Sequence, residues 1–216
     1  MNAITDNWGL FGDAFLRSLG ICLWAMVGAL VIGTVIAATR VSPVAPLRGF
    51  GTMYVTLIRN CPLTVVLFFI AFGLPEIGIN RSYYVFGVSA LAIYTAAFVC
   101  EALRSGINSV PAGQAEAARA IGLTFTQSLL TVILPQAFRT SIPPLGSVLI
   151  AMFKNSAVVG AFGVAGELFG TAVRLTSAQG YSSTPVFLAI GFFYLCITIP
   201  AGLILQVLER RAVIVR

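Results

Sequence analysis

Five polar side chains interrupt two otherwise apolar stretches of the sequence, and their types suit the binding of a small charged solute. They are Arg59, Asn60, Lys154, Asn155 and Ser156. A lysine in a hydrocarbon environment costs roughly 3 kcal/mol or more if it faces lipid, so Lys154 should face a cavity or a partner chain. An unpaired buried charge is very costly, so a path for a zwitterion must supply polar groups in place of water. Lys154 and Arg59 can meet carboxylates there, which would suit an acidic substrate.

The same residues also have a structural interpretation. Lys154 can pair with a carboxylate such as Glu101 or Glu167 and hold helices together. The Arg59 guanidinium can either reach the membrane surface, with the aliphatic part of the side chain in the hydrocarbon, or face a water-filled interior. Glu101 and Arg104 lie three residues apart, so they can pair on one helix face. The sequence leaves these alternatives open.

Covalent chemistry is not expected from this sequence. It contains no histidine, which is the commonest general base and metal ligand. It has no Gly-x-Ser-x-Gly nucleophile motif and no Walker-type phosphate-binding loop. The four cysteines lie in apolar stretches without paired spacing, so neither disulfides nor a metal site is predicted. An intramembrane enzyme therefore lacks support, and any use of ATP would have to come from a partner.

Composition places these residues in a membrane. Of the 216 residues, 58% are hydrophobic and 9% are charged, whereas a soluble domain is roughly a quarter charged. We predict an all-α polytopic membrane protein with one domain over 1–216 and about five spans, each able to cross ~30 Å of hydrocarbon. The predicted spans are about 15–39, 52–74, 83–103, 140–165 and 186–208. Pro62 should bend the second span, and the glycines from Gly160 to Gly170 favour short, broken helices around the end of the fourth.

Arginine is distributed unevenly between the two sides of this arrangement. Nine arginines fall on one side: Arg40, Arg48, Arg59, Arg104, Arg119, Arg139, Arg210, Arg211 and Arg216. Three fall on the other: Arg17, Arg81 and Arg174. The positive-inside rule then predicts an external N-terminus and a cytoplasmic C-terminus. This rule also explains the net charge of +6, because the basic residues are scattered singly and do not indicate nucleic-acid binding.

The longest polar stretch with helical features covers 109–135, on the predicted cytoplasmic side. Ser109 and Pro111 favour a helix start, since serine can cap free N–H groups and proline has no N–H to leave unpaired. A short helix is predicted to continue to about Ile121. Gly122 suits the left-handed turn that ends a helix. Small alanine side chains along this helix would let another surface approach its backbone.

A second helix is predicted directly after this turn. Thr124 and Gln127 have the spacing of a capping box, and Pro135 is predicted to interrupt the helix. One face of it carries apolar residues at helical spacing, namely Phe125, Leu129, Val132 and Ile133. The whole stretch is thus predicted to form a helix–turn–helix elbow. The alternative is a loop that only links two spans.

The elbow resembles the EAA motif of the permease subunits of bacterial ABC importers. That motif reads EAA, three residues, G, nine residues, I, one residue, LP. The matching residues are Glu116, Ala117, Ala118, Gly122, Val132, Leu134 and Pro135. Val132 stands in place of the usual isoleucine.

Further elements resemble the polar amino-acid permeases of that family. The run from Arg59 to Leu63 is similar to their RGTPL element, and 101–114 resembles their E-x-x-R-G-G-I…G-Q run. Residues 154–156 resemble their K-D/N-T/S element, and 40–44 is similar to actinobacterial glutamate-importer permeases. The resemblance extends from about Phe15 to the end of the chain.

This resemblance implies a five-span permease with the type I ABC importer fold in the bacterial cytoplasmic membrane. It implies a second permease, identical or homologous, an extracytoplasmic substrate-binding protein, and ATPase subunits that bind ATP and Mg²⁺. No cofactor is expected in this chain. The elbow would be the coupling helix held by the ATPase, through Glu116, Ala117, Ala118, Gly122, Leu134 and Pro135.

The substrate implied by the resemblance is glutamate or a related polar amino acid. The five polar residues described first would line its path. The alternative is a passive channel or a secondary transporter for small polar solutes. Such a protein should carry ion-coupling carboxylates in mid-span, whereas Glu101 is predicted near a span end and Glu76 in a loop.

Overall fold

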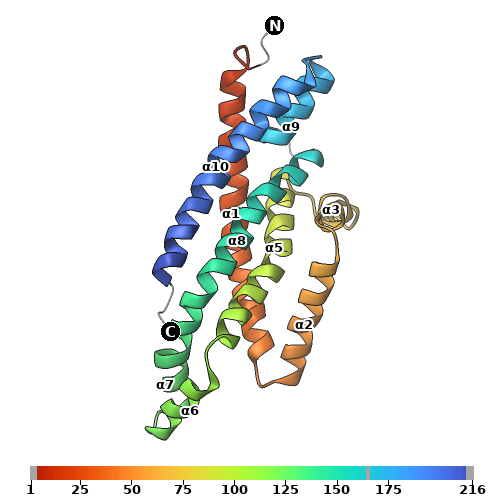
Figure 1. The fold of residues 1–216 in the computed structure, drawn as a ribbon. Coiled ribbons are helices and arrows are strands. Elements are labelled where there is room, and N and C mark those ends of the chain that lie inside the picture. Colours follow the sequence, from red (N-terminus) through yellow and green to blue (C-terminus); the bar gives the residue numbers. More distant parts are fainter. Residues whose placement is uncertain (1–3, 164–165, 213–216) are drawn as a thin grey trace.

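The fold is a bundle of helices arranged around α5 (Tyr83–Asn108). The computed structural model describes residues 4–163 and 166–212. In that part of the chain, α5 packs between α1 (Trp8–Val41) and α8 (Leu134–Ala161), and α10 (Ser183–Ala212) crosses α8 (Figure 1). All regular secondary structure in the described residues is helical, as predicted. Four helices there are long and apolar enough to cross a membrane, and a bent pair supplies a fifth candidate span.

Three predicted spans lie within longer helices. Those predicted at 15–39, 83–103 and 186–208 are contained in α1, α5 and α10. The 34 residues of α1 extend over about 51 Å at 1.5 Å per residue. This exceeds the ~30 Å of a hydrocarbon core, so α1 extends beyond the hydrocarbon.

The second span bends at Pro62, as predicted, but the bend is a break between two helices and the segment starts before residue 52. Helix α2 begins at Ala45, seven residues before the predicted start of the span, and ends at Asn60. Cys61 and Pro62 are then extended, because proline disfavours the helical conformation in the residue before it. The chain continues through α3 (Leu63–Phe68), the π-helical η1 (Phe69–Gly73) and α4 (Leu74–Glu76), at 105° to α2.

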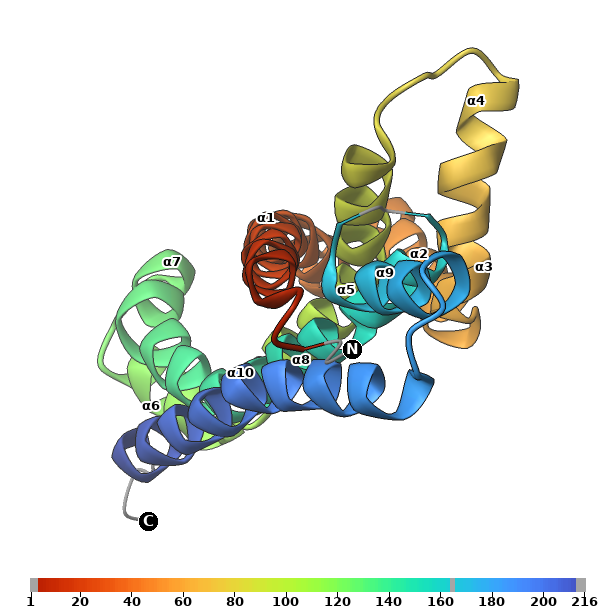
Figure 2. The same cartoon turned by 90° about the horizontal axis from the view of Figure 1, so that it is seen from above.

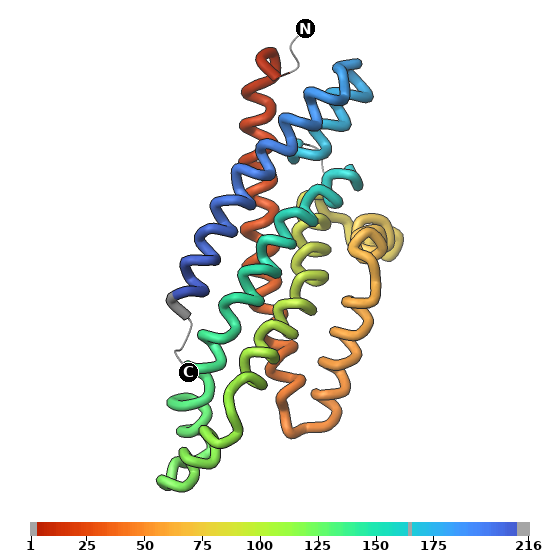
Figure 3. Tube along the Cα trace, in the orientation of Figure 1, coloured from red at the N-terminus to blue at the C-terminus, as the bar shows by residue number. Residues whose placement is uncertain are grey.

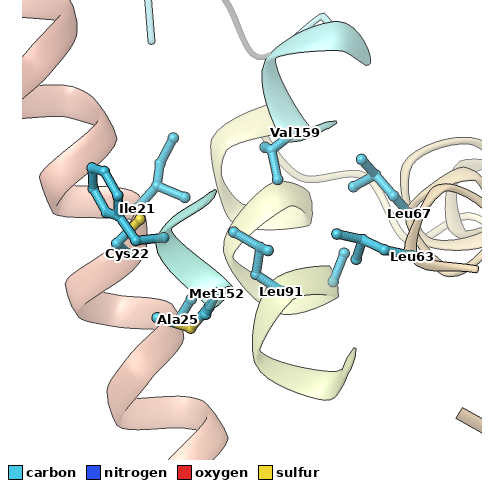
Figure 4. Packing of buried hydrophobic residues seen from close by; sticks show 10 residues of the cluster. Ile21, Cys22, Ala25, Leu63, Leu67, Leu91, Met152 and Val159 are labelled. Atoms are coloured by element: carbon cyan, nitrogen blue, oxygen red, sulfur yellow. The ribbon is translucent and has the colours of Figure 1, made fainter. Parts of the chain in front are cut away.

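Figures 1 and 2 show how this bent segment lies. In Figure 1, α2 runs alongside α5 and α3 is seen end-on, and the view from above in Figure 2 shows α3 and α4 lengthwise. The segment therefore lies across the bundle. Figure 4 shows its Leu63 and Leu67 facing Leu91 of α5 and Val159 of α8. These buried contacts hold the crossing segment against the bundle.

The fourth span is one long rod that begins earlier than predicted. Helix α7 (Phe125–Ser128), the π-helical η2 (Leu129–Ile133) and α8 follow one another without a break. Pro135 does not interrupt the rod, and that prediction was wrong. In the π turn, the Leu134 N–H donates to the Leu129 carbonyl five residues earlier. This wider turn accommodates a proline that cannot donate to the residue four positions before it.

Glycine residues end this rod, as predicted, although at Ala161 and not at residue 165. Gly163 and Gly166 have φ angles of +87° and +84°, which side chains with a Cβ rarely adopt. A short helix, α9 (Leu168–Val173), and the π-helical η3 (Arg174–Ala178) follow. Helical structure therefore continues beyond residue 165, the predicted end of the fourth span, as short separate elements.

Close packing of α1 on α5 depends on a glycine. A Cβ atom at Gly33 would lie 2.6 Å from Val99 Cγ1 and 2.8 Å from the Ala96 carbonyl oxygen. We expect Gly33→Ala to destabilise the protein by about 1–3 kcal/mol, the usual cost of overpacking a core. The measurement is the thermal-unfolding midpoint of the detergent-purified protein.

The same helix supplies a matched control for this prediction. Gly12 of α1 has no heavy atom within 4 Å of the corresponding Cβ position. Gly12→Ala should therefore stabilise α1 by up to about 1 kcal/mol, since alanine is the better helix former. Equal midpoints for the two variants would show that the α1–α5 contact is not close.

Candidate functional site

Two of the predicted solute-binding residues meet around one aromatic side chain. The guanidinium of Arg59, near the end of α2, lies 5.6 Å from the centroid of the Phe98 ring of α5. Phe98 and Asn155 of α8 line a cavity of about 200 Å³. Its other lining residues are Tyr94, Thr95, Val148, Ala151 and Met152. Phe98 of α5 thus contacts the Arg59 guanidinium of α2 and shares a cavity with the Asn155 amide of α8.

Of the five predicted residues, Asn155 is the one that lines this cavity, and Arg59 reaches only the Phe98 ring beside it. Lys154 is exposed, and it makes no hydrogen bond or ion pair within residues 4–163 and 166–212. The pairing of Lys154 with Glu101 or Glu167, left open by the sequence, does not occur in this structure. Asn60 donates its amide to the Thr56 carbonyl at 2.7 Å. Ser156 is buried, and its hydroxyl donates to the Phe153 carbonyl at 2.7 Å.

Glu101 lies at the centre of an ion cluster that unites three helices. The predicted pair on α5 is confirmed, with 2.8 Å between Arg104 Nη2 and Glu101 Oε2. Arg40 of α1 donates to Glu101 Oε1, and Arg59 Nη1 of α2 lies 3.8 Å from the same oxygen. One carboxylate with a side chain 20% exposed therefore serves three guanidinium groups. Sequence reasoning missed Arg40 and Arg59, because nothing in local spacing relates α1 or α2 to α5.

A buried carboxyl group lies between α8 and α9, outside the helices long enough to span a membrane. Glu167 is fully buried and caps α9, with its Oε1 accepting from the Gly170 N–H. Its Oε2 is buried without a hydrogen-bond partner. Burial raises the pKa of Glu167 to about 7, although N–H groups of Gly170 and Phe169 and the Ser18 hydroxyl oppose the shift. Groups with a charge or a titratable proton nearby are Cys22 and Arg17 of α1 and Tyr194 of α10.

The raised pKa of Glu167 predicts a pH-dependent stability. In the unfolded chain this carboxyl loses its proton near its ordinary pKa of 4.5, whereas in the folded protein it keeps it until about pH 7. The folded state then binds more protons between these values, so the free energy of unfolding should fall as pH rises from 4.5 to 7. We expect Glu167→Gln to flatten this slope. The measurement is the thermal-unfolding midpoint as a function of pH.

A control for this experiment is Glu76→Gln. Glu76 is exposed and forms no ion pair with any residue that the structure describes. Its replacement should leave the slope unchanged. A Glu167→Gln protein with the slope of the unmodified chain would contradict the assignment of a neutral buried carboxyl.

The elbow forms one end of the molecule. Figure 3 shows the chain turning there, at the end opposite the N-terminal part of α1. Its first arm is α6 (Ala112–Ala120), and Gly122 follows with φ +84°, as the sequence predicted. The capping box is also confirmed, since Thr124 accepts from the Gln127 N–H and the Gln127 side chain accepts from the Thr124 N–H.

One part of the predicted elbow was wrong. Pro111 is the first residue before α6, and Ser109 instead ends α5. The Ser109 hydroxyl donates to the Gly106 carbonyl at 2.7 Å and so satisfies a free carbonyl at the end of α5. It therefore does not cap α6.

The surface of the elbow combines the motif residues with exposed apolar side chains. Glu116, Ala117, Leu134 and Pro135 are exposed, whereas Ala118 is buried. Ile121 and Phe125, on either side of the turn, are 78% and 80% exposed. Sequence reasoning grouped Phe125 with an apolar helix face and gave Ile121 no role. The sequence did contain a signal for this surface. Two large apolar residues stand beside a glycine that was predicted to form an exposed turn, where polar residues are usual.

Comparisons with known proteins agree with this geometry. Residues 29–214 match the sequence family described as the binding-protein-dependent transport system inner membrane component. The chain is 39% identical to the probable glutamine ABC transporter permease protein GlnM of Bacillus subtilis, over 98% of this chain and 97% of that protein. It is 38% identical to the glutamate transport system permease protein GluC of Corynebacterium efficiens, over 93% of each.

Solved structures have the same fold. A chain from the crystal structure of an amino acid ABC transporter with histidines matches 96% of each chain at a TM-score of 0.91 and 33% identity. An inward-facing form of the MetNI methionine ABC transporter matches 94% of each chain at a TM-score of 0.72 and 22% identity. At that lower identity the second match concerns the fold alone.

Proposed function

Since the chain belongs to the family of inner membrane components of binding-protein-dependent transport systems, we propose that it forms the path by which an ATP-driven importer moves glutamate or a related polar amino acid inward. The two relatives compared above are named as permeases for glutamine and for glutamate. The Arg59 guanidinium beside Phe98 and the Asn155 amide supply groups that can bind a substrate carboxylate and ammonium. The proposed path consists of Arg59, Asn60, Lys154, Asn155 and Ser156, of which Ser156 is buried in this structure.

The observation that carries this proposal is the exposed elbow. Ile121 and Phe125 have large, exposed apolar side chains on either side of Gly122. They belong to the elbow, which forms one end of the molecule (Figure 3). A partner surface would bury them, and burial of such side chains contributes roughly 1.5–3 kcal/mol each. The sequence holds no Walker-type loop, so the proposed partner is an ATPase subunit that binds ATP and Mg²⁺ itself.

The transport cycle follows from this attachment. When ATP closes two ATPase subunits, the elbows of two permease subunits, identical or homologous, move together. The helices then open a path to the outside, where an extracytoplasmic binding protein releases the amino acid. Hydrolysis reverses the motion. The permease itself forms and breaks no covalent bond.

The proposed orientation places the elbow in the cytoplasm. Helix α10 runs towards the same end as α6, while α1 begins at the other end (Figure 1). This matches the arginine count, which puts the C-terminal side and the elbow inside. The N-terminus is then external.

Reconstitution tests the proposed function. The chain is placed in vesicles with its ATPase and binding protein, and uptake of labelled glutamate is measured with competing unlabelled amino acids. We expect uptake that requires ATP and is competed by glutamate, glutamine or aspartate. Equal uptake without ATP or ATPase would favour the passive channel or secondary transporter.

Variants of Lys154 distinguish a role in substrate contact from a role in assembly of the complex. We expect Lys154→Ala to reduce uptake while the complex still assembles, because the exposed ammonium has no partner among the described residues that its loss would leave unpaired. Lys154→Arg, which keeps the charge, is the control. Loss of assembly would instead show that Lys154 braces the complex through another subunit. Normal assembly and uptake in Lys154→Ala would exclude both roles.

A further inference from the structure

A basic groove lies between the ends of α1, α2 and α5 on the side of the elbow. It is a wide, open groove of about 760 Å³, lined by Arg40, Arg48 and Arg104, one from each helix. The remaining lining residues are Ala45, Gly49, Thr52, Met53, Thr56 and Leu57. The groove is separate from the cavity at Phe98 and Asn155, with which it shares no residue.

The positive charge of this groove is only partly neutralised. Arg40 and Arg104 share the single carboxylate of Glu101 with Arg59. Arg48 pairs with no carboxylate in the described chain, and its Nη1 donates to the carbonyls of Ser42 and Pro43 at the end of α1. The three arginines of the groove and Glu101 therefore carry a net charge of +2, which an anion can neutralise, and Arg59 adds a further guanidinium beside the same carboxylate.

The groove lies at the depth of lipid headgroups. Between Arg17 and Arg40, α1 is free of charged residues. This stretch is about 34 Å long at 1.5 Å per residue, close to the ~30 Å of a hydrocarbon core. One end of the stretch therefore brings Arg40, and the groove beside it, to the boundary between hydrocarbon and headgroups.

An apolar helix face borders the charged end of the groove. Leu47, Phe50, Met53 and Leu57 of α2 are exposed large hydrophobic residues, spaced three or four positions apart. Met53 and Leu57 also line the groove itself. A ligand that satisfies both regions has an anionic head and an apolar tail. A free anion would satisfy only the arginines.

We propose that this groove binds the headgroup phosphate of an anionic phospholipid, with an acyl chain along the exposed face of α2. Arg48 and Arg104 contact the phosphate, and Arg40 remains paired with Glu101. Basic pockets between membrane helices bind anionic headgroups through such charges, at about 1 kcal/mol per arginine near the surface. The site requires insertion in a membrane and does not depend on which amino acid is transported.

The test is a lipid titration of the assembled, delipidated transporter in detergent, followed by native mass spectrometry. The probes are phosphatidylglycerol, phosphatidylcholine with the same acyl chains, and glycerol 3-phosphate. We expect phosphatidylglycerol adducts to survive at concentrations where phosphatidylcholine adducts do not. Glycerol 3-phosphate should neither bind stably nor displace the lipid.

Variants locate the binding in the groove. Arg48→Gln should weaken phosphatidylglycerol binding about fivefold, the equivalent of one surface arginine. Arg48→Lys should restore most of it, since the charge remains. Arg139→Gln removes an exposed arginine from α8, outside the groove, and should leave binding unchanged.

Three outcomes would overturn the proposal. They are equal binding of the two lipids, equal effects of Arg48→Gln and Arg139→Gln, and displacement of phosphatidylglycerol by glycerol 3-phosphate, which would indicate a site for soluble anions. The unfolding midpoint of Arg48→Gln confirms that the variant is folded. ATP-dependent uptake is measured separately, so failure of the lipid site and failure of the importer function remain distinguishable.

Discussion

Gly122→Asp is expected to abolish amino-acid uptake while the transporter still inserts and assembles. Gly122 has φ +84°, a conformation that costs a residue with a Cβ about 1–2 kcal/mol. No heavy atom lies within 4 Å of the added Cβ, so the fold can accept the side chain. The loss should arise where the elbow meets its partner, because a strained turn with a new charge stands between Ile121 and Phe125. The measurements are uptake and ATP hydrolysis stimulated by the loaded binding protein.

Gly78 offers a closely matched control for this variant. It has φ +85° and no heavy atom within 4 Å of a Cβ position. It lies between α4 and α5, away from the elbow. Gly78→Asp should therefore leave the coupling of ATP hydrolysis to uptake intact. Wild-type uptake in Gly122→Asp vesicles would contradict the coupling role of the elbow.

Glu101→Gln is expected to produce the largest loss of stability. It removes the one carboxylate that Arg40, Arg59 and Arg104 share, and it leaves three guanidinium groups facing one another. Breaking a buried ion pair from one side costs about 3–5 kcal/mol, and the partial exposure of this cluster places the expected loss at about 3 kcal/mol. The measurement is the unfolding midpoint of the purified transporter.

The control for the ion cluster is again Glu76→Gln, which removes an exposed carboxylate that has no ion pair in the described part of the chain. Its effect should stay within about 0.5 kcal/mol. If Glu101→Gln and Glu76→Gln shift the unfolding midpoint equally, the Glu101 cluster does not hold α1, α2 and α5 together.

Much of the fold could be predicted because the spans are long and strongly apolar. The breaks were harder to predict, for specific reasons. Pro62 indicates that a helix must end or bend, but the 105° angle depends on Leu63 and Leu67 packing against α5 and α8. Pro135 indicates an interruption, yet a π turn ahead of it keeps the rod continuous. In both places tertiary packing or turn type decides, and neither is visible in local sequence.

The candidate site divides in the same way. The turn at Gly122 and the capping box of Thr124 depend on neighbouring residues only, so the sequence predicted both. The pair Glu101–Arg104 follows from a spacing of three residues on a helix. The contact of Arg59 with Glu101 and Phe98 joins different helices, and only the three-dimensional structure could reveal it.

The most direct test of the account is cysteine cross-linking between the elbow and the ATPase. Ala120→Cys on α6 is introduced after Cys61 and Cys196, the two cysteines that are not buried, are replaced by serine. Ile79→Cys, between α4 and α5, is the matched position away from the elbow. We predict a cross-link from residue 120 to the ATPase subunit, with a yield that changes on addition of ATP, and none from residue 79. Absence of any cross-link from residue 120 in an actively transporting complex would contradict the account.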